Sequence, residues 1–170
     1  MTPSMLRAGP GEIADVLAVL DEAAAWLGEQ GVRQWPQRFE REWVEPAVLA
    51  GETWLAFGGE HVLATVTLDR TDGLWADRPA SATYVHRLAV RRVAAGLGGG
   101  ILDWAATRAT AEGCQFLRLD CVARNRRLRA YYEAAGFEHC GDVQVAGPPG
   151  GREEPGPAVS VSRYELALQR

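Results

Sequence analysis

The chain has 170 residues, 47% hydrophobic and 24% charged, which suits one domain around a single hydrophobic core. Its net charge of −4 argues against a nucleic-acid-binding protein. The sequence contains no lysine, which excludes a Walker phosphate loop and a lysine Schiff base. The three cysteines lack the C-x-x-C spacing of zinc sites, and no apolar run reaches the length of a membrane span or a signal region. We therefore expect a cytoplasmic protein that binds no metal, nucleic acid or membrane.

The first half of the chain predicts two helices and a hairpin of strands. Apolar residues recur at i, i+3 and i+4 in the first helix, and a Gly-Gly-Glu-His turn joins the two strands. The elements expected in order are a helix over 13–27 ended by Gly28 or Gly31, a helix over 39–49, strands over 53–57 and 62–68, and a loop over 71–79.

The second half predicts a strand–helix–strand unit, a short capped helix and a last strand. The expected elements are a strand over 82–90, a turn over 91–100, a helix from 101 that ends at Gly113, a strand over 116–122, a helix capped by Asn125 and ended by Gly136, and a strand over 159–168. Residues 146–157 hold four prolines and four glycines, which indicates a flexible loop. This order predicts a mixed α/β sheet with helices on both faces.

The turn over 95–100, Ala-Gly-Leu-Gly-Gly-Gly, has the composition of a phosphate-binding loop. Glycines let a ligand approach the backbone, and amides at a helix N-terminus favour an anion. A dinucleotide fold is one alternative, because Asp120 follows at about the distance of a ribose-binding acid. Its glycines should follow the strand directly, however, and here five residues separate Val90 from Gly96.

Two segments resemble the GCN5-related N-acetyltransferase (GNAT) superfamily, in particular its small bacterial members. Residues 86–100 are similar to its acetyl-CoA motif, Gln/Arg-x-x-Gly-x-Gly/Ala, with Gly98 and Gly100 on the motif glycines. Ala95 stands at the Gln/Arg position, a departure that leaves phosphate binding to the backbone. Asn125, the only asparagine, and the run Tyr-Tyr-Glu-Ala-Ala-Gly-Phe over 131–137 resemble the family's second segment. The close resemblance covers residues 82–140.

The resemblance implies an α/β (α+β) fold whose mixed, mostly antiparallel sheet of six to seven strands is flanked by helices. One domain would span 1–170, with an acceptor-side half over 1–81, an acetyl-CoA-binding core over 82–140 and C-terminal strands over 141–170. It implies acetyl transfer from acetyl-CoA, the co-substrate, to a primary amine of a small molecule or peptide N-terminus by direct attack. Gln34-Trp35-Pro36 would help to form the acceptor pocket. Homodimers are common in the family. A non-catalytic acyl-CoA-binding module on the same fold stays an alternative.

The resemblance also implies which backbone groups hold the cofactor. Those of Leu88 and Val90, on either side of Ala89, would pair with pantetheine, and the amides of the turn would hold the pyrophosphate. The cofactor-binding set is therefore Leu88, Ala89, Val90, Ala95, Gly96, Leu97, Gly98, Gly99, Gly100 and Asn125.

Three residues are candidates for proton transfer. Tyr132 matches the family tyrosine that protonates the leaving thiolate, and its phenol can donate at neutral pH. His86 is a candidate base, because imidazole titrates near neutrality and strand alternation places it on one face with Leu88 and Val90. Asp120, acting through water, is the second candidate base. We expect Cys121 to be a small buried hydrophobic residue rather than a nucleophile.

Overall fold

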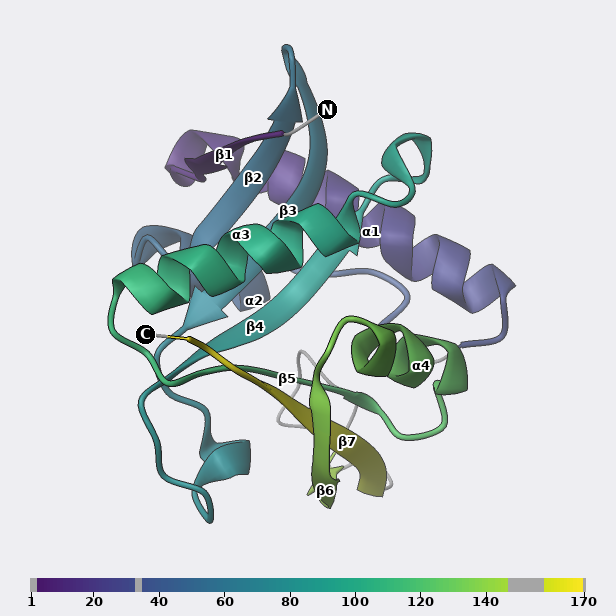
Figure 1. Ribbon diagram of the computed structural model, residues 1–170. Coiled ribbons are helices and arrows are strands. Elements are labelled where there is room, and N and C mark those ends of the chain that lie inside the picture. Colours follow the sequence, from purple (N-terminus) through teal and green to yellow (C-terminus); the bar gives the residue numbers. More distant parts are fainter. Residues whose placement is uncertain (1–2, 33–34, 147–157, 170) are drawn as a thin grey trace. The chain divides into compact units, whose positions relative to one another are not determined.

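The computed structural model describes residues 3–32, 35–146 and 158–169. They form a mixed α/β fold whose seven-stranded sheet is mostly antiparallel and flanked by helices, which confirms the predicted fold class (Figure 1). The chain divides into two compact units, one made of Met1–Leu68 and His86–Ile101 and the other of Asp69–Val85 and Leu102–Arg170. Within the described ranges, no helix combines the length and apolar character needed to cross a bilayer.

In the first unit, two helices share one core with the sheet. The strand order is β1-β2-β3-β4, with β1 antiparallel to β2 and β2 antiparallel to β3. The elements are β1 (Ser4–Arg7), α1 (Ile13–Glu29), α2 (Arg41–Leu49), β2 (Thr53–Gly58), β3 (His61–Asp69) and the second half of β4 (Ala82–Val90). Buried residues of α1 and α2 form this core with Leu55 of β2 and Ala89 of β4.

Local sequence explains these elements. The apolar stripe of α1 is buried at Ile13, Val16, Leu20 and Ala24, as the 3.6-residue period predicts. The chain turns after α1 with Gly31 at φ +73°, and the β2–β3 hairpin turns with Gly59 at φ +63°. The helix predicted over 39–49 begins two residues later than expected, at Arg41.

In the second unit, strands from distant parts of the chain lie side by side. The first half of β4 is parallel to β5 (Phe116–Val122), β5 is antiparallel to β7 (Ala158–Ala167), and β7 is antiparallel to β6 (Glu138–Ala146). α4 (Arg126–Ala134) lies beside β6 (Figure 1). α3 (Gly98–Ala111) begins in the first unit and continues into the second.

The local sequence pattern predicted neither β1 nor β6, although the resemblance implied C-terminal strands over 141–170. β1 is only four residues long and mostly exposed, so it leaves almost no alternation to detect. β6 is polar and irregular, with a register shift between His139 and Asp142 beside Gly141 at φ +90°. The loop expected over 71–79 contains a 3₁₀ turn, Gly73–Trp75. Of the loop expected over 146–157, residues 147–157 lie outside the described residues.

Candidate functional site

The glycine-rich segment connects β4 to α3, but the helix expected from 101 begins at Gly98, so the last three glycines of the expected turn open the helix. β4 ends at Val90, a 3₁₀ turn spans Arg92–Ala94, and α3 begins at Gly98. The first amides of an α-helix have no carbonyl partner within the helix and carry the positive end of its dipole. The amides of Gly98, Gly99 and Gly100 occupy this position, so the turn offers hydrogen-bond donors to an anion.

The glycines of this segment leave room for a ligand to approach the backbone closely. Gly96 has φ +97°, a conformation that side-chain-bearing residues rarely adopt. Gly100 lies in the helix, and a methyl group added to it would meet no protein atom within 4 Å. Ala95 is exposed and has no polar side chain, and its backbone amide already donates to the carbonyl of Arg92 at 3.2 Å, so it offers an anion no free donor.

A contact that the sequence did not predict holds the turn on α1. The backbone amide of Arg92 donates to the Glu22 carboxylate at 3.1 Å, and the Arg92 guanidinium lies 4.1 Å from the centre of the Trp26 ring. The neighbouring amide of Arg91 donates to the carbonyl of Leu63 on β3 at 2.8 Å. Hydrogen bonds from the amides of two successive residues, Arg91 and Arg92, therefore hold the start of the turn.

The strand that leads into the turn departs from extended backbone at Arg87, which has φ +49°. A left-handed residue breaks the two-residue alternation of side chains, because it turns the backbone that follows. The inference that His86 shares a face with Leu88 and Val90 therefore does not extend past Arg87. Leu88 and Val90 are half-buried, whereas Ala89 points into the core of the first unit.

Tyr132 of α4 is 7% exposed, and its ring lies 5.9 Å from the rings of Phe137 and Tyr164. Burial raises its pKa strongly, and the nearby groups of Cys121 and Asp120 raise it further. The phenol therefore keeps its proton at neutral pH and can act as a hydrogen-bond donor.

Cys121 and Asp120 are neighbours on β5. Cys121 is 3% exposed, and burial, followed by the charge of Asp120, raises the pKa of its thiol to about 12. A thiol with so high a pKa is a poor nucleophile at neutral pH, as expected from the sequence. Asp120 is half-buried, and an oxygen of its carboxylate lies within 4.8 Å of one from Asp72. Asp72 lies in the segment 71–79, which the sequence predicts as a loop.

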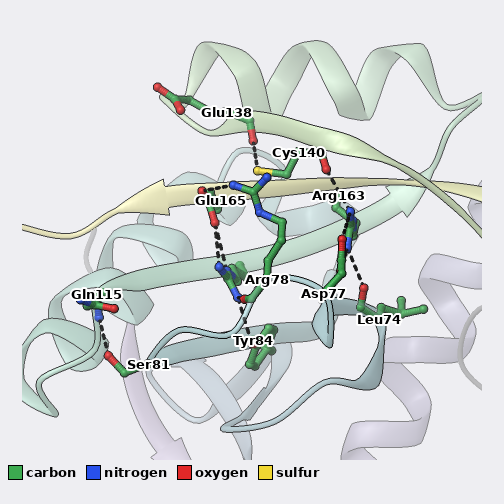
Figure 2. A network of polar contacts seen from close by, with 11 residues as sticks. Leu74, Asp77, Arg78, Ser81, Tyr84, Gln115, Glu138, Cys140, Arg163 and Glu165 are labelled. Carbon is green, nitrogen blue, oxygen red and sulfur yellow. Dashed lines mark hydrogen bonds and ion pairs between the residues drawn. The ribbon is translucent and has the colours of Figure 1, made fainter.

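A network of arginines and carboxylates holds the segment that contains Asp72 (Figure 2). Asp72 accepts a hydrogen bond from the amide of Leu74, whose carbonyl accepts one from Arg163. Arg163 also pairs with Asp77 at 2.6 Å, and Arg78 of the same segment pairs with Glu165 at 3.2 Å. These contacts fix residues 72–78 against β7.

The remaining candidates have structural contacts of their own. Asn125 caps α4, since its side-chain oxygen accepts a hydrogen bond from the amide of Leu128 at 3.1 Å. His86 is half-buried on β4. Trp35 packs against the core of the first unit and makes an edge contact with Phe39 at 5.6 Å. Gln34 lies outside the described residues.

Comparison with known proteins gives consistent matches. Residues 20–137 match the model of the acetyltransferase (GNAT) family. The uncharacterized N-acetyltransferase YesJ of Bacillus subtilis (strain 168) is 32% identical over 139 residues, which cover 74% of this chain and 76% of that protein.

Solved structures share the fold at lower identity. A GNAT-family acetyltransferase from Listeria monocytogenes 4b F2365 superposes with a TM-score of 0.77 and 22% identity, covering 98% of this chain and 95% of that one. The putative acetyltransferase yncA from Salmonella typhimurium, solved with its cofactor acetyl-CoA, gives a TM-score of 0.67 and 14% identity over 100% of this chain and 96% of that one.

Proposed function

Because the chain belongs to the acetyltransferase (GNAT) family and is thus an acyltransferase, we propose that it transfers acetyl from acetyl-CoA to a primary amine. The observation that supports this most directly is the glycine turn that opens α3, where donor amides and open space at Gly100 suit a pyrophosphate. The acceptor we propose is a small-molecule amine or a peptide N-terminus.

In this proposal the chain binds acetyl-CoA mainly through its backbone. Of the amides over 95–100, those of Ala95 and Leu97 already donate to carbonyls of the preceding turn, so the glycine amides bind the pyrophosphate. The backbone groups of Leu88 and Val90 pair with the amides of the pantetheine arm. Ala95 supplies no charge, so affinity depends on the turn geometry that Glu22 and Trp26 support through Arg92. Asn125 supports the acetyl-CoA site by capping α4, the helix that begins at Arg126.

The proposed chemistry is direct attack of the neutral amine on the thioester carbonyl carbon. A C–N bond forms, the C–S bond breaks, and the electron pair of that bond leaves with the sulfur. The nitrogen gives up a proton to a base, and the departing sulfur accepts a hydrogen bond from the Tyr132 hydroxyl and takes its proton from the protonated base or from water. Burial raises the pKa of Tyr132, so the phenol is protonated and can donate this hydrogen bond at neutral pH, while the raised pKa of Cys121 argues against an acetyl-enzyme intermediate.

Two residues are proposed for the base, Asp120 acting through water and His86. Asp120 is supported by its neighbourhood, because its charge acts on Tyr132 and its carboxylate lies close to that of Asp72. Comparing the pH profiles of kcat/KM for Asp120→Asn and His86→Gln separates the two, since only loss of the true base removes the acidic limb.

The decisive experiment is ligand titration followed by a turnover screen. Calorimetry with acetyl-CoA and, separately, with NAD distinguishes an acyl-CoA site from a dinucleotide site. Thiol release is then measured with amino acids, polyamines, aminoglycosides and peptides with free N-termini. Binding of acetyl-CoA with saturable thiol release supports the proposal. Binding without thiol release from any amine would favour a non-catalytic acyl-CoA-binding module, and binding of NAD alone would refute the proposal.

A further inference from the structure

Arg87 combines an unfavourable backbone conformation with a specific side-chain anchor. Among the described residues other than glycine, only Arg87 has a positive φ, at +49°. It lies inside β4, where extended backbone is the rule. A left-handed conformation is disfavoured in a residue that has a Cβ atom, so surrounding contacts must maintain it.

The anchor lies on α2. Nη1 of Arg87 donates a hydrogen bond of 2.7 Å to the backbone carbonyl of Trp43. A carbonyl oxygen has two lone pairs, so it can accept this bond in addition to the usual helical one. Trp43 is itself fixed, because its ring makes an edge contact with Phe39, whose amide donates to Asp21 of α1 at 2.8 Å. The guanidinium of Arg87 is therefore tied to a residue that contacts its neighbours in the first unit.

The conformation of Arg87 determines the direction of the residues that follow. Ala89 points into the core while Leu88 and Val90 remain half-buried. An extended residue at position 87 would restore strict alternation and turn the amides and carbonyls of the next residues. These backbone groups are the ones assigned above to pantetheine.

We propose that Arg87 is a positioning residue for the pantetheine arm of acetyl-CoA, its side chain being anchored on the Trp43 carbonyl to hold the left-handed backbone that aims Leu88 and Val90. This inference rests on the proposed function, because it needs acetyl-CoA to lie along β4. It assigns Arg87 no contact with the reacting atoms.

Substitutions at position 87 separate the backbone from the side chain. Arg87→Ala removes the anchor and keeps the left-handed penalty, so affinity for acetyl-CoA should fall about 5- to 30-fold, as expected for a penalty of roughly 1–2 kcal/mol. Arg87→Gly also removes the anchor, but glycine adopts this conformation without penalty, so affinity should return to within about threefold of the wild type. Arg87→Met, which retains much of the side-chain bulk without the donor, should behave like alanine and serves if the alanine variant does not fold.

The ligands provide the control for nonspecific damage. Calorimetry compares acetyl-CoA with 3′-phosphoadenosine 5′-diphosphate, which has the nucleotide and pyrophosphate but no pantetheine. Arg87→Ala should leave the affinity for the nucleotide unchanged, and Arg41→Ala, at an exposed arginine of α2, should change neither affinity. Equal weakening of both ligands, wild-type affinity of the alanine variant, or a glycine variant as weak as alanine would each overturn the inference. A wild-type protein that binds no acetyl-CoA would instead refute the proposed function.

Discussion

Replacing Gly100 with alanine should raise stability and lower affinity for acetyl-CoA at the same time. Gly100 lies in the first turn of α3, and an added methyl group meets no protein atom within 4 Å. Alanine is favoured over glycine in a helix by about 1 kcal/mol, and less than that near the end of one. For a chain of this size, about 1 kcal/mol corresponds to an increase in Tm of roughly 2–4 °C.

The same methyl group would occupy the space that the pyrophosphate is proposed to approach. Loss of one hydrogen bond to a charged group costs about 1.5–3 kcal/mol, which predicts a rise in Kd of roughly 10- to 100-fold. Thermal unfolding without ligand measures the first effect, and calorimetry with acetyl-CoA measures the second. The two effects have opposite signs, so a loss of folded protein cannot imitate the loss of binding.

Gly28 of α1 provides a matched control. It is also an exposed helical glycine, and a methyl group added there also meets no atom within 4 Å. Gly28→Ala should therefore raise the Tm by a similar amount and leave the Kd for acetyl-CoA unchanged. If Gly100→Ala binds acetyl-CoA as tightly as the wild type, the pyrophosphate does not lie against the start of α3 and the reasoning fails.

Four further predictions concern chemistry and stability. Tyr132→Phe keeps the ring contacts with Phe137 and Tyr164, so kcat should fall at least about tenfold while the KM for acetyl-CoA is retained, and normal turnover would remove Tyr132 from the mechanism. Cys121→Ala should keep turnover within about threefold, because a thiol of pKa about 12 is no nucleophile, and an acetylated Cys121 found by mass spectrometry would contradict this. Glu165→Gln removes the charge partner of Arg118, which is 2% exposed, and should lower the free energy of unfolding by about 3 kcal/mol. As a control, Glu45→Gln removes an exposed charge partner of Arg41 and should lower the free energy of unfolding by less than about 0.5 kcal/mol. Equal losses in the two variants would refute the argument. Hydrogen bonds from Ser162 and then His139 lower the pKa of Asp142 below 3.8. The contribution of Asp142 to the free energy of unfolding is therefore present above pH 3.8 and is lost as the pH falls through the lowered pKa. Asp142→Asn should lack this part of the acid dependence when denaturant unfolding is compared at pH 7 and pH 3.

Elements with a strong local signal were predictable from the sequence. The apolar stripe of α1, the β2–β3 hairpin and β4 follow from periodicity and turn residues, and the structure places them within a few residues of expectation. The Asn125 cap and Gly136, at φ +93° after α4, also act within one or two turns of their own helix. β1 and β6 lacked such a signal because one is very short and the other is polar and irregular.

The candidate site was predictable only where it is made of consecutive residues. The glycine turn is local, so its composition and place in the chain were enough to identify it. Asp72 and Asp120 lie close together although they are far apart in the sequence, which one-dimensional spacing does not reveal. Nothing in the local sequence marks Arg87 as left-handed, and the carbonyl that its guanidinium contacts lies 44 positions earlier in the sequence.

The charged residues of β5 and β7 show why strand periodicity does not by itself determine exposure. Strand alternation places Arg118 on the opposite face of the sheet from its apolar neighbours Leu117 and Leu119. A charged residue in that position ordinarily faces solvent. Arg118 is nevertheless buried, paired with Glu165 and stacked 4.4 Å from the ring of Trp75. The period assigns a side chain to one face of the sheet, but the segment that covers that face comes from elsewhere in the chain. Burial of a strand charge therefore has to be inferred from its partners, and in this protein the partners are held by the same segment that contains Asp72.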